Sequence, residues 1–276
     1  TDADTLDSFT SDGFQVDADV KVNTNAEDYV AWNWKANGTG SANTAGSINT
    51  TATSANTTAG FSIVSYTGNG TDGATLGHGL GVVPKMMIIK RRAGAVGDWP
   101  VYHTALGATK HLYLNDTDAV ATYAYFFSNT EPTSTLFSVG DDGKVNINTH
   151  TYIAYIFAEK QGFSKFGSYV ANGNADGTFV FCGFRPAFVM FKNSSAVQNW
   201  SIMDNKRDGF NSANKNLGPN TTGTEDDTTG YIDFLSNGFK LRNSWTVFNG
   251  SGNTIVFMAF AESPFVNSNG VPNNAR

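Results

Sequence analysis

The stretch Gly60–Gly70 reads GFSIVSYTGNG, and the stretch Gly162–Gly173 reads GFSKFGSYVANG. Phe61 and Phe163 hold the same place in the two stretches and lie 102 positions apart (163 − 61 = 102). Further blocks recur at nearly the same distance: VPKMMIIK and RPAFVMFK, DWPVY and NWSIM, LFSV and GFKL, and YIFAE and MAFAE. Similarity at one fixed period marks a repeated structural unit, so the sequence predicts two tandem units of about 100 residues each.

Short strands separated by tight turns are the expected content of each unit. Met86–Lys90 and Phe188–Lys192 are apolar runs that closely follow a proline, which is typical of buried strands entered from an extended residue. Asn-Gly dipeptides, which favour tight turns, occur at Asn69, Asn172, Asn237 and Asn249. The pattern predicts an all-β protein in which each unit is a jelly-roll-like β-sandwich.

The N-terminal region resembles part of a third unit. Ser11–Val16 (SDGFQV) matches Ser236–Leu241 (SNGFKL), and Asp28–Ala36 follows the pattern of Thr151–Glu159. Residues 1–36 are therefore interpreted as a partial β unit, the C-terminal half of a repeat. The chain does not begin with Met, which suggests processing or partial coverage. Either upstream sequence is missing, or these two strands complete a sheet elsewhere.

A segment of unusual composition separates the partial unit from the first full one. Residues 37–60 contain only Gly, Ser, Thr, Asn and Ala apart from Ile48, and they carry no charge. The segment is either a flexible linker or an extended strand along a neighbouring sheet, and the second interpretation is favoured. The predicted organisation is completed by β unit 1 over residues 61–160 and β unit 2 over residues 161–276.

Composition excludes several classes of partner. Charged residues make up 15% of the chain, against about one-quarter in average globular proteins, and aromatic residues make up 13%. The net charge is −6, and the only dense basic cluster is Lys90-Arg91-Arg92, so nucleic-acid binding is not expected. No apolar run approaches the ~18 residues of a membrane span, so membrane insertion is not expected either.

Residues that could carry chemistry give no catalytic set. The single cysteine, Cys182, excludes an intramolecular disulfide and is expected in a buried strand. Asp141-Asp142 and Glu225-Asp226-Asp227 lie in turn-rich loops, where carboxylates are usually solvated, although two suitably spaced carboxylates can cleave glycosides. We therefore predict no catalytic residue, no cofactor and no metal site, while a loose divalent site stays open. The histidines, expected in structural or surface roles, form no HxH or HxxxH pair: His78, His103, His111 and His150.

Tryptophans are the candidates for surface binding. Trp99 and Trp200 hold equivalent repeat positions and are expected as core or interface anchors. Trp245 has no counterpart in the other unit and lies among Asn and Ser, where an exposed ring can stack on a sugar. Trp34 follows Trp32 in an alternating pattern, which predicts that one ring faces inward and the other outward. Trp245 and Trp34 are therefore the candidate surface-binding residues.

Several blocks resemble a known family. The blocks at residues 61–70, 77–85, 164–169, 183–187 and 233–242 resemble a domain of unknown function that is common in marine tailed bacteriophages, cyanophages included. The terminal block Phe260–Phe265 fits the same pattern, and the resemblance covers residues 61–276. It implies a virion structural protein at the particle surface, typically a fibre, spike or other appendage. It implies no catalytic residues, and it leaves open whether the appendage sits on tail or capsid.

Three functional hypotheses follow. The leading one is a non-enzymatic phage virion protein, a fibre or spike subunit that contacts the host surface. Its expected partners are further copies of itself in a homo-oligomer, of which a trimer is one form, other virion proteins, and a host surface glycan. The second is a purely structural assembly, capsid-decorating or filament module, whose N-terminal half-unit adds strands to a neighbouring subunit. The third is a glycan depolymerase.

Overall fold

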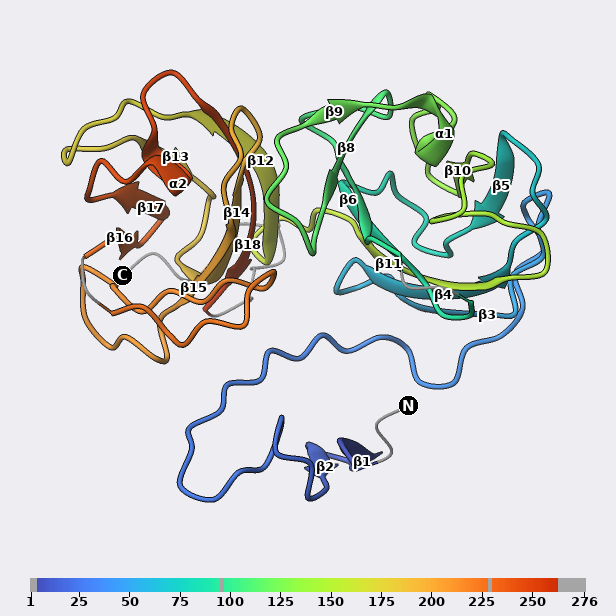
Figure 1. Ribbon diagram of the computed structural model, residues 1–276, viewed down its shortest axis with the longest axis horizontal. Coiled ribbons are helices and arrows are strands. Elements are labelled where there is room, and N and C mark those ends of the chain that lie inside the picture. Colours follow the sequence, from blue (N-terminus) through green and yellow to red (C-terminus); the bar gives the residue numbers. More distant parts are fainter. Residues whose placement is uncertain (1–3, 95–96, 228–229, 263–276) are drawn as a thin grey trace. The chain divides into compact units, whose positions relative to one another are not determined.

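The computed structural model describes residues 4–94, 97–227 and 230–262 (Figure 1). Its contacts divide the chain into two compact units, Thr1–Trp34 and Lys35–Arg276. Strands dominate the described residues, and the two helices among them, α1 and α2, have one turn each. The predicted all-β class is confirmed: the strands form several antiparallel sheets, consistent with a β-sandwich.

The first group of strands, here called the first sandwich, forms a long sheet and a short one (Figure 1). The long sheet has the order β3-β4-β11-β6-β7-β8-β9, and the short sheet pairs β10 with β5. The elements are β3 (Ala52–Asn56), β4 (Phe61–Thr67), β5 (Ala74–Gly77), β6 (Met86–Arg91), β7 (Pro100–His103), β8 (Lys110–Tyr113), β9 (Ala121–Thr122), α1 (Ala124–Phe127), β10 (Leu136–Val139) and β11 (Thr151–Phe157).

The remaining strands form the second sandwich, with the sheet orders β12-β18-β14-β15 and β13-β17-β16. The elements are β12 (Ser164–Val170), β13 (Phe179–Phe181), β14 (Pro186–Asn193), β15 (Trp200–Asp204), β16 (Ile232–Leu235), β17 (Gly238–Leu241), α2 (Thr246–Asn249) and β18 (Thr254–Ala261). The order β12-β18-β14-β15 repeats, strand for strand, the order β4-β11-β6-β7 of the first sandwich.

Equivalent hydrogen bonds brace the two sandwiches. The hydroxyl of Tyr66 donates to the Val145 carbonyl, and that of Tyr169 donates to the Phe248 carbonyl, both at 2.7 Å. Two buried asparagines make a second equivalent pair of contacts: Asn146 accepts from the Asn69 N–H and donates to the Thr71 carbonyl, as Asn249 does with Asn172 and Asn174. These contacts agree with the repeated blocks in the sequence, while the tandem duplication itself stays a prediction.

Each sandwich encloses its own core, and the two cores lie on either side of a shared interface. One core holds inward side chains of β4, β6 and β11, and the other holds those of β14 and β18. The predicted buried runs Met86–Lys90 and Phe188–Lys192 are confirmed, because they form most of β6 and β14. The β18 strand is buried on both faces, since its outer face meets the first sandwich. There the ring of Phe260 contacts that of Phe157, with centroids 6.2 Å apart.

Polar groups lock the same interface. The indole Nε1–H of Trp200 donates to the Tyr113 carbonyl at 2.7 Å. The buried ammonium of Lys192 donates to the Thr117 carbonyl at 3.0 Å. His103 Nδ1 accepts from the Ala105 N–H, so its Nε2 carries the proton and donates to the Phe257 carbonyl at 3.1 Å. Each intramolecular hydrogen bond contributes about 0.5–1.5 kcal/mol net, so together these bonds favour the packed interface.

The N-terminal region forms a hairpin that contains one of the two expected strands, since the block Ser11–Val16 includes β2. The strands β1 (Leu6–Phe9) and β2 (Phe14–Val16) pair antiparallel. The pattern over Asp28–Ala36 predicts a strand, but these residues have no regular secondary structure. Their counterpart in each sandwich is a central strand flanked on both sides, and within Thr1–Trp34 the described residues provide no such neighbours.

Part of the Gly/Ser/Thr/Asn-rich segment lies extended along the first sandwich. Ala52–Asn56 forms β3, which pairs antiparallel with β4. Further upstream, the Ile48 N–H donates to the Thr75 carbonyl at 3.0 Å, and the Ile48 side chain enters the first core. The division of the chain at residues 36, 60 and 160 stays a prediction.

Candidate functional site

The loop between β15 and β16, residues 205–231, contains most of the acidic residues that the sequence singles out. Isolated bridges hold the loop against the second sandwich, pairing Ile202 with Leu217 and Ala213 with Ile232. A third bridge, between Asn216 and Asp226, closes the loop on itself. The charged side chains of the loop therefore stand on a backbone that the sheet positions.

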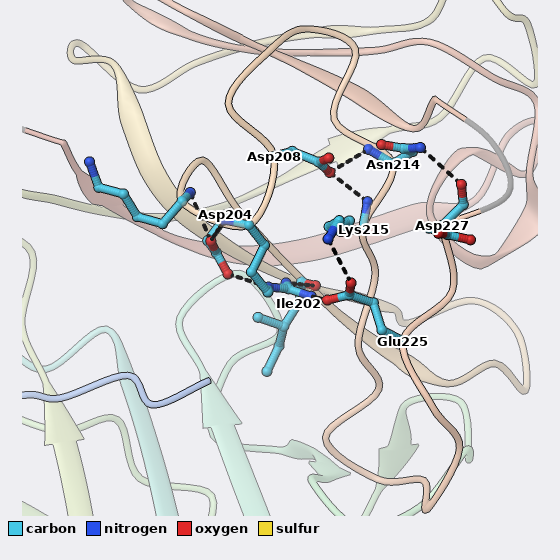
Figure 2. Close-up of polar contacts among 9 residues, drawn as sticks. Ile202, Asp204, Asp208, Asn214, Lys215, Glu225 and Asp227 are labelled. Atoms are coloured by element: carbon cyan, nitrogen blue, oxygen red, sulfur yellow. Dashed lines mark hydrogen bonds and ion pairs between the residues drawn. The ribbon is translucent and has the colours of Figure 1, made fainter. Parts of the chain in front are cut away.

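A chain of charges crosses this loop (Figure 2). One carboxylate oxygen of Asp204 accepts the backbone N–H groups of Lys206 and Arg207, and the other accepts Arg207 Nε at 2.7 Å. Arg207 continues to Glu225, whose second oxygen lies 3.3 Å from the ammonium of Lys215. Asp208 accepts the backbone N–H groups of Asn214 and Lys215, at 2.7 and 2.6 Å. Each of these carboxylates is thus occupied in holding the loop.

The surroundings of Asp204 favour the ionised form of its carboxyl group. Burial alone would raise its pKa, but the hydrogen bonds and positive charge of Arg207 outweigh burial and hold the pKa below its ordinary value. Glycoside hydrolysis needs one carboxyl group that stays protonated near neutral pH, which requires a raised pKa. Asp204 therefore suits a structural role rather than that of a proton donor.

Trp245 lies beside the same loop, against the second core. Its ring is half-buried and stacks on Tyr231, with centroids 4.9 Å apart and planes 25° apart. It also meets Phe248 edge-on at 5.3 Å. The Tyr231 hydroxyl donates to Asp226 at 2.6 Å, so the structure brings together the tryptophan and the acidic run that the sequence singles out separately. Trp245 is only partly buried, so part of the residue stays accessible to solvent.

Trp32 and Trp34 are both half-buried, and Ala31 before them and Asn33 between them are exposed. The expected difference in orientation between the two rings therefore stays a prediction. Trp34 lies at the end of the compact unit Thr1–Trp34, whereas Trp245 belongs to the other unit.

Three of the four histidines are buried: His78 and His103 are hydrogen-bonded, whereas His111 packs among aromatic rings and its Nδ1 has no hydrogen-bond partner in the part of the chain that the structure describes. Burial lowers the pKa of His103 to about 4, and burial together with the charge of Lys144 lowers that of His111 to about 4. His78 accepts the Leu80 N–H and meets the Thr133 carbonyl, and its pKa is lowered by burial. His103 and Asp204 occupy equivalent turns, since each accepts the N–H two residues later. Among the described residues, no three His, Cys, Asp or Glu side chains are grouped as metal ligands would be.

Cys182 is buried, and burial raises the pKa of its thiol to about 12. The surrounding segment differs from the expected buried strand, however. In β13 only Val180 is buried, while Phe179 and Phe181 are exposed. Successive side chains of a strand point to opposite faces, so Val180 faces the second core while Phe179 and Phe181 face outward.

Sequence reasoning did not identify three residues of the site. Arg207, Lys215 and Tyr231 tie the acidic residues together, yet none belongs to a recognisable motif. The available signal was the position of three basic residues, Lys206, Arg207 and Lys215, within a loop that has no equally long counterpart after β7. No helix among the described residues is long and apolar enough to cross a membrane.

These features define an antiparallel all-β protein whose candidate site is a charged loop beside a half-buried tryptophan. Over residues 1–264 the chain matches the model of a family described as a domain of unknown function, DUF7483, and it belongs to this family. The expected membership in a family of unknown function is thereby confirmed, and the match includes the N-terminal unit. Of the terminal block Phe260–Phe265, Ser263, Pro264 and Phe265 lie outside the described residues. Comparisons with curated proteins and with solved structures give no significant match.

Proposed function

We propose that this chain is a non-enzymatic structural protein of a bacteriophage virion, a subunit of a fibre- or spike-type appendage at the particle surface. The proposal rests on one observation: the side chains that could take part in catalysis are occupied in packing or hydrogen bonding within the fold. Asp204, His103 and Cys182 are each held in packing or in hydrogen bonds that serve the fold. The resemblance of residues 61–276 to a phage domain supports the same assignment, as do the low charge and the neutral polar surface.

The test is the presence of the protein in particles. Virions purified from a producing host should contain the chain in a fixed number of copies, measured by quantitative mass spectrometry, and antibody labelling should place it on an external appendage. If the purified chain neither forms multimers nor is found in particles, this proposal fails.

Contact with a host surface glycan is proposed for the half-buried ring of Trp245. Replacing Trp245 with Leu keeps an apolar side chain against Tyr231 but removes the flat ring on which a sugar could stack. We expect binding to surface polysaccharide of the host to weaken by about tenfold, measured by biolayer interferometry.

The control for this prediction is Tyr125→Leu, which alters an exposed aromatic ring of the first sandwich. Circular dichroism should show both variants folded. Equal binding of the polysaccharide by wild type and Trp245→Leu would show that Trp245 does not contact the glycan.

An assembly module is the second candidate function, and one observation favours it. None of residues 4–34 is buried, and Phe9 and Val20 are 77% and 72% exposed. A unit with so much uncovered apolar surface suits a contact with another subunit.

Deletion of residues 1–34 should then leave both sandwiches folded, because both cores lie in Lys35–Arg276, while it abolishes oligomers. Thermal melting and light scattering would measure the two effects. Oligomers that persist after the deletion contradict the assembly role.

A further inference from the structure

One edge of the first sandwich is covered by the chain's own segment, and the cover involves both sheets. β3 pairs along β4 in the long sheet. Upstream of β3, the Ile48 N–H donates to the carbonyl of Thr75 in β5, on the short sheet. The side chains of Ile48 and Thr50 are 6% and 2% exposed, so the covering segment seals this edge.

The equivalent edge of the second sandwich is formed by β12 and β13, and it is open in the described part of the chain. β13 pairs with β17 as β5 pairs with β10, with Val180 opposite Phe239 where Leu76 is opposite Phe137. By this register, Phe179 and Phe181 take the places of Thr75 and Gly77. In the other sheet, β12 is an end strand whose last residue, Val170, takes the place of Thr67.

The open edge carries apolar side chains where the covered edge carries small or polar ones. Val170, Phe179 and Phe181 are 62%, 43% and 62% exposed. Natural edge strands are usually guarded by charge, proline or a covering segment, because an open edge recruits other strands. β13 has the sequence Phe-Val-Phe and offers no charge of its own.

Backbone groups at this edge are also available for pairing. The Thr178 carbonyl accepts the Leu241 N–H, and the Cys182 N–H donates to the Asn237 carbonyl, so alternate residues of this strand bond towards β17. Backbone groups alternate sides along a strand, so those of Phe179 and Phe181 face away from β17. An extended segment could therefore add to β13 as the chain's own segment does to β5.

The chain offers no such cover locally. Only residues 158–163 separate β11 from β12, and they are too few to turn back and run along the edge. The covering strand must therefore come from a more distant region or from another molecule.

The N-terminal hairpin has the matching properties. In β1–β2, Phe9 lies opposite Phe14, as Phe234 lies opposite Phe239 in β16–β17. Phe234 and Phe239 are 2% and 0% exposed within the second core, whereas Phe9 and Phe14 are 77% and 38% exposed. The hairpin thus resembles one that packs against a sandwich, with its apolar side chains uncovered.

Charge argues against pairing of two N-terminal units with each other. Thr1–Trp34 holds eight acidic residues and one basic residue, Lys21, a net charge of −7 (1 − 8 = −7). Residues 35–276 therefore carry +1, since the whole chain carries −6 (−6 + 7 = +1). Two N-terminal units would repel each other, whereas the β12–β13 edge presents them with an uncharged apolar strand.

We propose that the β1–β2 hairpin of one chain adds to the open β12–β13 edge of a second copy, an inference that rests on the proposed assembly function. The donor and acceptor surfaces differ, so one-way addition is head-to-tail and builds rings or filaments, whereas a reciprocal exchange of hairpins closes a two-fold dimer. Such a contact suits an appendage built from many copies of one chain.

The first experiment compares full-length chains by light scattering after size exclusion. The wild type should form oligomers, and the double variant Phe179→Lys/Phe181→Lys should be monomeric, because charges on the edge block strand addition. The matched control is Val82→Lys/Val83→Lys, at two exposed apolar positions of the first sandwich, which should assemble like the wild type. A monomeric wild type, or an edge variant that still assembles, overturns the proposal.

The second experiment separates donor from acceptor. A chain lacking residues 1–34 keeps the edge but has no hairpin, and the Phe179→Lys/Phe181→Lys chain keeps the hairpin but has a blocked edge. Each should be monomeric alone, and an equimolar mixture should form a one-to-one complex. Self-assembly of either chain, or no complex on mixing, overturns the head-to-tail contact. Particles that contain a monomeric chain would leave the virion role standing while the inference fails.

Discussion

Replacing Trp200 with Ala should lower the free energy of unfolding by about 3–5 kcal/mol, the range for removing a large buried aromatic side chain. Trp200 is 2% exposed at the interface between the sandwiches. The substitution opens a cavity there and also leaves the Tyr113 carbonyl without its indole donor. Urea denaturation at pH 7, followed by far-ultraviolet circular dichroism, measures the loss.

Two control variants separate packing from hydrogen bonding. Trp200→Phe keeps most of the packing and should cost about 1 kcal/mol for the lost hydrogen bond. Trp99→Ala changes the equivalent position of the first sandwich, where the half-buried ring mainly meets the Lys90 ammonium at 5.0 Å, and it should cost about 1 kcal/mol. Equal losses for Trp99→Ala and Trp200→Ala would show that the interface does not depend on Trp200.

Acidification should destabilise the protein between about pH 6.5 and pH 4, and His103 should account for a large share of the effect. Burial lowers the pKa of His103 to about 4 in the folded chain, against an ordinary value of about 6.5. In this window His103 is protonated in the unfolded chain but neutral in the folded chain, so the free energy of unfolding falls as the pH falls. A difference of about 2.5 pKa units corresponds to about 3 kcal/mol.

The variant His103→Gln tests this assignment, because glutamine can accept and donate hydrogen bonds but does not titrate. The measurement is the free energy of unfolding of wild type and variant at a series of pH values from 8 to 4. The gap between the two curves should narrow or reverse by about 3 kcal/mol as the pH falls. Parallel curves would mean that His103 has the same pKa in the folded and unfolded chains, which contradicts the lowered pKa.

The fold class could be predicted because its signals are local and repeated. Asn-Gly dipeptides at Asn69 and Asn237 lie beside β4 and at the β16–β17 turn, and the apolar runs around Met86 and Phe188 form buried strands. Turn chemistry and apolar runs depend on neighbouring residues, so a single sequence displays them. The recurrence of the blocks strengthened each of these signals.

The remaining features depend on contacts between distant residues. Asp28–Ala36 has the pattern of a central strand, but the described residues of Thr1–Trp34 give it no neighbouring strand, and a strand requires partners as well as pattern. β13 was expected to be buried, yet only Val180 faces the core while Phe181 faces outward, and an all-apolar run does not show which of its residues meet a second layer. The ion pair of Arg207 with Glu225 joins positions 18 apart in a loop without periodicity.

The central place of β18 has a mechanical consequence that bears on the proposed role at a particle surface. β18 pairs along most of its length with β12 on one side and β14 on the other. Antiparallel hydrogen bonds lie perpendicular to the strands, so tension applied along β18 from its C-terminal end loads both ladders in shear and all their bonds at once. A strand at a sheet edge pulled sideways would instead lose its bonds one after another. The second sandwich is therefore built to resist pulling forces that act through the end of β18.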